Sequence, residues 1–195
     1  MSSTVLYMSM SLDGFIAGPN VRVDNGLGDG GLRLHDWLFA AEPAVNGQVY
    51  DEFMATGAVV AGRGTAEPAG FWGGDHHGGV PIFILSRSRP EASQWPLVKF
   101  VSDVRTAMRR AKEAAGDKDV LVHGAGTAQL ALAAGVLDEL ELHVIPVLLG
   151  EGRRLFEHLG PEHVELERTR VLAGEGGVTH IRYRVRRDER LAAAS

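Results

Sequence analysis

Short apolar runs alternate with helical patterns along most of the chain. Apolar residues at helical spacing predict helices over residues 47–56, 103–115 and 127–134. Asp103 near the start of the second helix and Gly116 after it are typical boundary residues. Continuous apolar runs predict buried strands over residues 5–9, 58–61, 80–85, 99–101 and 120–122. Strands that alternate with helices indicate an α/β domain with a parallel sheet.

The last third of the chain has a different pattern. Residues 139–149 predict one long apolar strand, and residues 164–172 and 178–185 predict two strands joined by a glycine-rich turn. Two such strands form an antiparallel hairpin by default. We expect one domain over residues 1–187, followed by a flexible tail at 188–195.

Composition narrows the functional classes. The chain has 195 residues and no cysteine, so it forms no disulfides. Its net charge of −5 gives no general basic surface for binding nucleic acid. The start of the chain lacks a signal-peptide pattern, and no apolar run could cross a bilayer, so a cytoplasmic protein is expected. Many of the 25 glycines crowd into residues 25–31 and 70–79, where we expect surface loops that could cover a site.

The most informative segment is the run from Asp119 to Leu130, where an apolar strand turns sharply into a helix. The first N–H groups of such a helix have no partner, and the helix dipole adds positive potential. Gly124 and Gly126 would let a phosphate approach this backbone without a Cβ in the way. Gln129 stands where a Rossmann fingerprint has its third glycine, so the classical dinucleotide motif is absent.

Two further strand ends carry residues suited to phosphate. The first is Gly62-Arg63-Gly64-Thr65 and the second is Ser86-Arg87. Each segment alone has an ordinary structural explanation, but ligands gather beyond the carboxyl ends of parallel strands. Arginine binds phosphate oxygens in a bidentate way, and two separate phosphate positions favour NADP over NAD.

The chain resembles the dihydrofolate reductase-like family, which includes the C-terminal reductase domain of riboflavin-biosynthesis enzymes. The matching segments are residues 11–17, 62–65, 84–87, 124–128, 135–140 and 146–156, in family order. The resemblance implies a three-layer fold with a mixed, mainly parallel sheet, NADPH as hydride donor, and a homodimer. It places the cofactor at Ile16, Ala17, Gly62, Arg63, Thr65, Ser86, Arg87, Gly124, Ala125, Gly126, Thr127 and Ala128.

Three residues are candidates for the chemistry. Reduction of a C=N or C=O group calls for a proton donor near the acceptor. The resemblance points to an acid on the helix at 47–56, where Glu52 stands beside Asp51, with Asp36 upstream; a solvated helix face is the alternative. Asp13 lies in the first strand-end loop, where a turn-forming role competes. His123, where related reductases carry an acidic residue, could orient the substrate or tune proton transfer near neutral pH.

Three other residues form a possible apolar wall. Trp37, Phe71 and Trp72 could stack on a flat ring or pack in the core. Asp75-His76-His77 lacks the spacing of a metal site, so no metal is expected.

The leading hypothesis is an NADPH-dependent reductase of a small nitrogen heterocycle: a pterin, a folate, or a pyrimidine such as 5-amino-6-ribosylaminouracil. The alternatives are a non-catalytic NADP-binding protein and a structural dimer module with the 139–149 strand at its interface.

Overall fold

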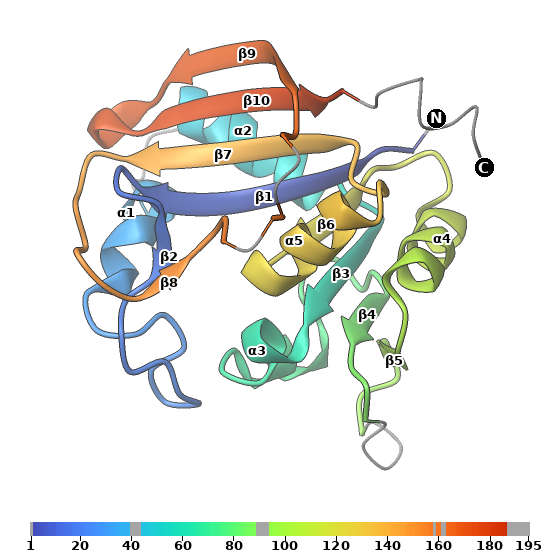
Figure 1. The fold of residues 1–195 in the computed structure, drawn as a ribbon. Coiled ribbons are helices and arrows are strands. Elements are labelled where there is room, and N and C mark those ends of the chain that lie inside the picture. Colours follow the sequence, from blue (N-terminus) through green and yellow to red (C-terminus); the bar gives the residue numbers. More distant parts are fainter. Residues whose placement is uncertain (1, 40–43, 89–93, 158, 161–162, 187–195) are drawn as a thin grey trace.

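The computed structural model describes residues 2–39, 44–88, 94–157, 159–160 and 163–186. Its centre is an eight-stranded sheet in the order β5-β4-β3-β6-β1-β7-β10-β9 (Figure 1). The strands from β5 to β7 run parallel, whereas β10 is antiparallel to both β7 and β9. A second, two-stranded antiparallel sheet pairs β2 with β8. The strands are β1 (Thr4–Ser11), β2 (Phe15–Ala17), β3 (Ala58–Gly62), β4 (Ile82–Leu85), β5 (Val98–Val101), β6 (Val120–His123), β7 (Glu139–Ile145), β8 (Arg153–Arg154), β9 (Leu166–Ala173) and β10 (Thr179–Val185).

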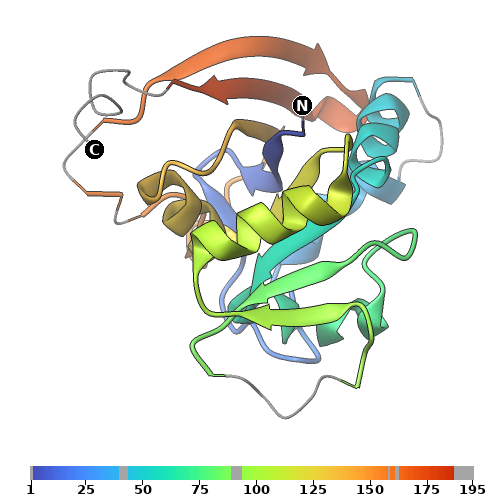
Figure 2. The ribbon, with the colours of Figure 1, turned by 90° about the vertical axis from the view of Figure 1, so that its right-hand side faces the viewer.

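Helical segments cover both faces of the large sheet. The helices are η1 (Gly31–His35), α1 (Asp36–Phe39), α2 (Val45–Met54), α3 (Arg63–Ala66), η2 (Gly70–Gly74), α4 (Val104–Ala115), α5 (Ala125–Ala133) and η3 (Glu175–Gly177). Alternate residues of β1 point to opposite faces: Leu6 and Met8 pack in the core with α4 and α5, whereas Val5 and Tyr7 face Phe53 of α2. Figure 2 shows the β9–β10 hairpin arching over the end of the molecule opposite β4 and β5.

The predicted α/β architecture, with its mainly parallel sheet and C-terminal hairpin, is confirmed. β7 ends at Ile145 rather than at residue 149, because Pro146 has no backbone N–H to continue the ladder. Residues 63–66, which follow directly on the end of β3, form the short helix α3. The short strand β2 had no pattern of its own and exists through its pairing with β8.

β7 lies inside the sheet, with hydrogen-bonded neighbours on both edges. Its register joins Leu140 to Leu6 of β1 and to Tyr183 of β10. β7 therefore has no free edge through which a second copy could pair, and the dimer module itself stays a prediction. The predicted tail at 188–195 lies outside the described residues. Within the described part of the chain, no helix has the length and apolarity to span a membrane.

The glycine-rich segment 70–79 is packed rather than a plain surface loop. Phe71 contacts Trp95 and Phe100, with ring centroids at 5.0 and 6.1 Å. His77 is buried and its Nε2 lies 3.0 Å from the Thr56 hydroxyl. These contacts hold the segment against the same face of the sheet as α2.

Candidate functional site

The three predicted strand ends meet at one edge of the sheet. β4, β3 and β6 are consecutive parallel neighbours, with Leu85 beside Gly62 and Ala61 beside His123. Their carboxyl ends therefore point to the same side, which is where open α/β sheets bind ligands. Three hollows lie there, which we name the main cavity, the α5 groove and the arginine recess.

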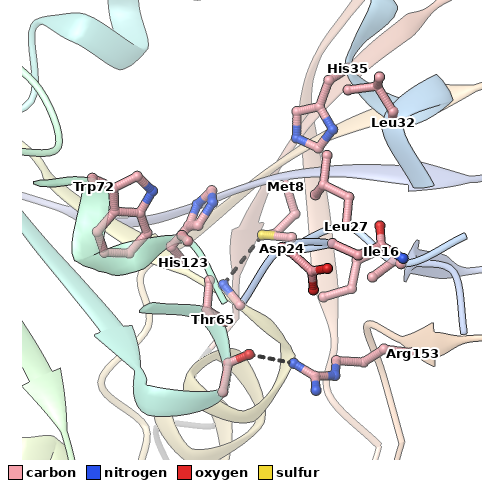
Figure 3. A pocket seen from close by; sticks show the side chains of 17 residues that line it. Met8, Ile16, Asp24, Leu27, Leu32, His35, Thr65, Trp72, His123 and Arg153 are labelled. Carbon is pink, nitrogen blue, oxygen red and sulfur yellow. Dashed lines mark hydrogen bonds between the residues drawn. The ribbon is translucent and has the colours of Figure 1, made fainter. Parts of the chain in front are cut away.

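The main cavity has a volume of about 410 Å³. Figure 3 shows it between His123 and Trp72 on one side and Ile16, Leu27 and His35 on the other. Both segments predicted as possible covers contribute residues to it. The lining consists of Met8, Ile16, Ala17, Asp24, Asn25, Gly26, Leu27, Gly28, Leu32, His35, Gly64, Thr65, Ala69, Trp72, His123, Gly124 and Arg153.

Two histidines give the main cavity its polar character. The Nδ1 atoms of His35 and His123 are both buried without a hydrogen-bond partner. Burial, followed by the positive charge that His35 can carry, lowers the pKa of His123 to about 4. Burial likewise lowers the pKa of His35. Both rings are thus neutral near pH 7, so His123 faces the main cavity without a positive charge at that pH.

Of the three aromatic residues suggested as an apolar wall, Trp72 lines the main cavity. Its ring lies 6.3 Å from that of His123, at 72°. Trp37 is instead buried against His143, 4.5 Å between ring centroids, and donates to the Ser9 hydroxyl. Phe71 is partly buried and packs against the core beside Trp95 and Phe100.

The α5 groove, of about 310 Å³, is lined by Gly62, Gly64, Thr65, Leu85, Gly126, Thr127, Leu130 and Arg153. The Thr127 hydroxyl is buried there without a hydrogen-bond partner. A polar atom in that position is one that a ligand could satisfy. The first intrahelical bond of α5 runs from Ala128 N to Gly124 O, so the preceding N–H groups have no acceptor within the helix.

The arginine recess is lined by Arg63, Leu85, Ser86, Arg87 and Ser88. Arg63 is partly engaged, because its guanidinium pairs with Glu67 and donates to the Ser88 hydroxyl at 2.6 Å. Arg87 is exposed. An anion here would meet the guanidinium of Arg87, two residues after β4, and would share that of Arg63 with Glu67.

Ten of the twelve predicted cofactor residues line one of these hollows. Ala125 and Ala128 do not, because their side chains pack in the core beneath α5. Only their backbone atoms remain available to a ligand.

Asp13 does not line the main cavity. Its carboxylate accepts hydrogen bonds from the Ser11 hydroxyl and from the N–H groups of Leu149 and Gly150, at 2.6, 3.1 and 2.8 Å. The Ser11 hydrogen bond, with those from the backbone, lowers the pKa of Asp13 to about 2. A carboxyl group that is ionised and turned to a neighbouring loop is a poor proton donor, and it fits the turn-forming role.

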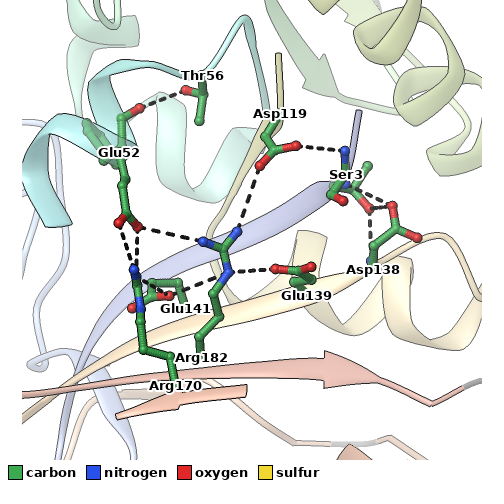
Figure 4. A network of polar contacts seen from close by, with 11 residues as sticks. Ser3, Glu52, Thr56, Asp119, Asp138, Glu139, Glu141, Arg170 and Arg182 are labelled. Atoms are coloured by element: carbon green, nitrogen blue, oxygen red, sulfur yellow. Dashed lines mark hydrogen bonds and ion pairs between the residues drawn. The ribbon is translucent and has the colours of Figure 1, made fainter. Parts of the chain in front are cut away.

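Glu52 also lies away from the cavity, in an ion network that joins α2 to the C-terminal hairpin (Figure 4). Both of its oxygens accept from Arg170 at 2.7 Å. Arg170 also reaches the fully buried Glu141 at 3.1 Å. Nor do Asp36 and Asp51 line the cavity. Of the predicted catalytic residues, His123 alone reaches the main cavity.

We expect Glu52→Gln to lower the free energy of unfolding by about 1–2 kcal/mol, because a bidentate, half-buried ion pair loses its charge. NADPH affinity should be unchanged. Urea unfolding and a binding titration measure the two quantities. Glu113→Gln is the control: its exposed pair with Arg109 should contribute under about 0.5 kcal/mol. Equal losses in both variants, or weaker NADPH binding in Glu52→Gln, would contradict the structural role.

The histidine pair of segment 70–79 has structural contacts instead of a metal-site arrangement. The Nδ1 atoms of His76 and His77 lie 2.8 Å apart, and His77 reaches Thr56. The described residues contain no group of three or more metal-ligating side chains suitably placed for an ion.

Sequence reasoning assigned no site role to His35, Asp24 or Arg153. His35 follows an irregular segment with no periodicity, so nothing in the sequence distinguishes it. Arg153 lies within the segment 146–156, which is one of those that carry the family resemblance, and this is the one sequence feature that could have indicated a site role for it.

Known proteins are similar to this chain over most of its length. The RibD C-terminal domain family matches residues 3–179. The uncharacterized protein YwjB of Bacillus subtilis (strain 168) is 28% identical over 167 residues, covering 82% of this chain and 85% of YwjB. A Shewanella sp. PV-4 structure, named as a riboflavin biosynthesis protein, has a TM-score of 0.71 at 23% identity, covering 95% of this chain and 99% of its own.

A dihydrofolate reductase from Enterococcus faecalis, complexed with NADP(H), has a TM-score of 0.60 at 13% identity, covering 95% of this chain and 97% of its own. The fold is therefore dihydrofolate reductase-like, as the sequence resemblance implied. The chain belongs to the RibD C-terminal domain family.

Proposed function

We propose that the protein is an NADPH-dependent reductase of a small, flat, nitrogen-containing heterocycle of pterin, folate or riboflavin-pathway pyrimidine type. The observation that carries this proposal is the convergence of three parallel strand ends on adjoining hollows. The family supports a reductase, and a dihydrofolate reductase of similar fold was solved with NADP(H). A homodimer and a cytoplasmic location stay predictions.

The residues present fit NADPH. The unpartnered Thr127 hydroxyl and the free N–H groups of α5 suit a diphosphate in the α5 groove. An added Cβ at Gly126 would meet no heavy atom within 4 Å, so space for a ligand exists beside this backbone. The arginine recess suits a 2′-phosphate, and Ile16 and Ala17 suit the nicotinamide. When bound, NADPH would supply the hydride.

The main cavity favours a neutral, planar substrate. Trp72 offers an aromatic face, and the neutral rings of His35 and His123 offer hydrogen bonds without charge. At neutral pH, His123 would therefore orient the substrate, or pass on a proton from water, without starting as a charged imidazolium.

Thermal denaturation tests the cofactor. NADPH should raise the melting temperature more than NADH at equal concentration, because the arginine recess recognises the extra phosphate. The difference should shrink in Arg87→Gln. Equal shifts with both nucleotides in the unmodified protein would count against NADP preference, and no shift with either would remove the proposal.

A non-catalytic NADP-binding protein is the second candidate. One observation favours it, namely that, among the described residues, the main cavity lacks a buried acid that could donate a proton. The carboxylate among its lining residues is that of Asp24, which is exposed and pairs with Arg22 at 2.8 Å. NADPH oxidation with dihydrofolate, oxidised pterins and the ribosylaminouracil substrate separates the two candidates. Tight NADPH binding without turnover on any of them would favour this one.

A further inference from the structure

Arg153 lies where two of the hollows meet, and contacts with β2 and Gly64 hold it there. It begins β8 and pairs with Ala17 of β2, so the small sheet fixes its backbone. Gly152 approaches Ala17 so closely that a Cβ would lie 2.1 Å from the Ala17 carbonyl oxygen. The contact permits only glycine at 152, so the chain passes directly beside β2 as it enters β8.

The side chain of Arg153 spans the boundary between the main cavity and the α5 groove and lines both. Its Nη1 donates to the Gly64 carbonyl at 2.8 Å, as Figure 3 shows. A guanidinium has five N–H donors, so most of them remain for a ligand. Within the described ranges, no carboxylate lies within ion-pair distance of Arg153, and its charge is not neutralised by an acidic partner there.

We propose that Arg153 is a diphosphate-binding residue, which closes the α5 groove opposite the first turn of α5 and the Thr127 hydroxyl. This inference rests on the proposed function, because the diphosphate is that of a nicotinamide dinucleotide. Hydrogen-bond donors to the diphosphate then come from two sides. One side has the backbone N–H groups of α5 and the buried Thr127 hydroxyl, and the other has the Arg153 guanidinium, which the Gly64 carbonyl anchors. The 2′-phosphate lies apart from this pair, in the arginine recess.

The neighbouring Arg154 provides a matched control. It has the same charge and is also exposed, but its Nη1 donates to the Asp13 carbonyl at 2.8 Å and its guanidinium lies over the Phe15 ring at 4.3 Å. Arg154 lines none of the three hollows.

The test is a calorimetric titration of NADPH and of NADH into the unmodified protein, Arg153→Gln, Arg154→Gln and Arg87→Gln. Because both nucleotides carry the diphosphate, Arg153→Gln should weaken both by the same factor, about 10- to 100-fold. Arg87→Gln should weaken NADPH alone, and Arg154→Gln should change neither by more than about twofold. Arg153→Lys, which keeps the charge, should recover part of the loss.

The other outcomes have definite meanings. Unchanged affinity in Arg153→Gln overturns the inference, as does a loss confined to NADPH, which would place Arg153 at the 2′-phosphate. Equal losses in Arg153→Gln and Arg154→Gln would also overturn it, because they would reflect damage to the loop instead of a lost contact. If the unmodified protein binds neither nucleotide, the proposed function itself fails, a result distinct from all of these.

Discussion

Gly124→Ala should destabilise the protein by about 2–4 kcal/mol and weaken NADPH binding at least tenfold. Gly124 precedes α5 with a φ of +90°, a conformation that alanine adopts only with strain. The added Cβ would also lie 2.1 Å from the Thr65 hydroxyl, which lines both the main cavity and the α5 groove. The turn must shift to relieve that contact, and it carries the first N–H groups of the helix with it.

Two matched variants separate strain from ligand contact. In Gly126→Ala the added Cβ meets no heavy atom within 4 Å, and Gly126 lies in a helix at negative φ. Its stability should be unchanged or slightly higher, while a Cβ facing the diphosphate should weaken NADPH binding. Adding Thr65→Ala to Gly124→Ala should restore part of the stability, since the hydroxyl is then gone. Urea unfolding measures both; a Gly124→Ala protein as stable as the unmodified one would contradict the packing argument.

The sequence predicted this turn because its signals are local. An apolar run, two glycines and a helical pattern suffice to predict a strand, a tight turn and unpaired N–H groups. The adjacency of β4, β3 and β6 is not local, so the sequence predicted only that these strand ends share one edge of a parallel sheet and not that the three strands are neighbours.

Tertiary contacts decided what the sequence left open. Glu52 has the residue type and helix position of a proton donor, but Arg170, which is far away in the sequence, reaches it from β9. The Asp13 carboxylate likewise accepts hydrogen bonds from the backbone N–H groups of Leu149 and Gly150. No periodicity in residues 5–17 could reveal those partners. His35 and Arg153 enter the site for the same reason, since their positions depend on how distant segments pack.

A further histidine pair lies in the core, where β7 pairs with β10 of the hairpin. The Nδ1 atoms of His143 on β7 and His180 on β10 are 2.9 Å apart, and His180 Nε2 lies 3.0 Å from the Asn46 side-chain oxygen. Trp37, two residues from His35, packs on both rings. Burial, followed by the positive charge of Arg170, lowers the pKa of His180 to about 4. Burial and His180 lower that of His143 well below its usual value.

Stability should therefore fall as the pH drops below about 6.5, the ordinary pKa of histidine in an unfolded chain. Above that pH, histidine is neutral in both the folded and the unfolded state, so the buried pair adds no pH dependence to the free energy of unfolding. Between pH 6.5 and about 4, His180 binds a proton in the unfolded chain but stays neutral in the folded protein, so the free energy of unfolding decreases. His180 alone should account for about 2 kcal/mol between pH 7.5 and pH 5. His143 adds a loss in the same direction.

The variant His180→Gln isolates this contribution. It should be less stable than the unmodified protein at pH 7.5, because the contacts with His143 and Asn46 change. Its further loss down to pH 5, however, should be about 2 kcal/mol smaller. Urea unfolding at pH 7.5, 6 and 5 gives both slopes, and His163→Gln, an exposed histidine near the start of β9, serves as the control with an unaltered slope. Parallel slopes for His180→Gln and the unmodified protein would mean that the buried pair does not resist protonation. A smaller slope would show that the chain keeps two neutral histidines in its core at the expense of stability in acid.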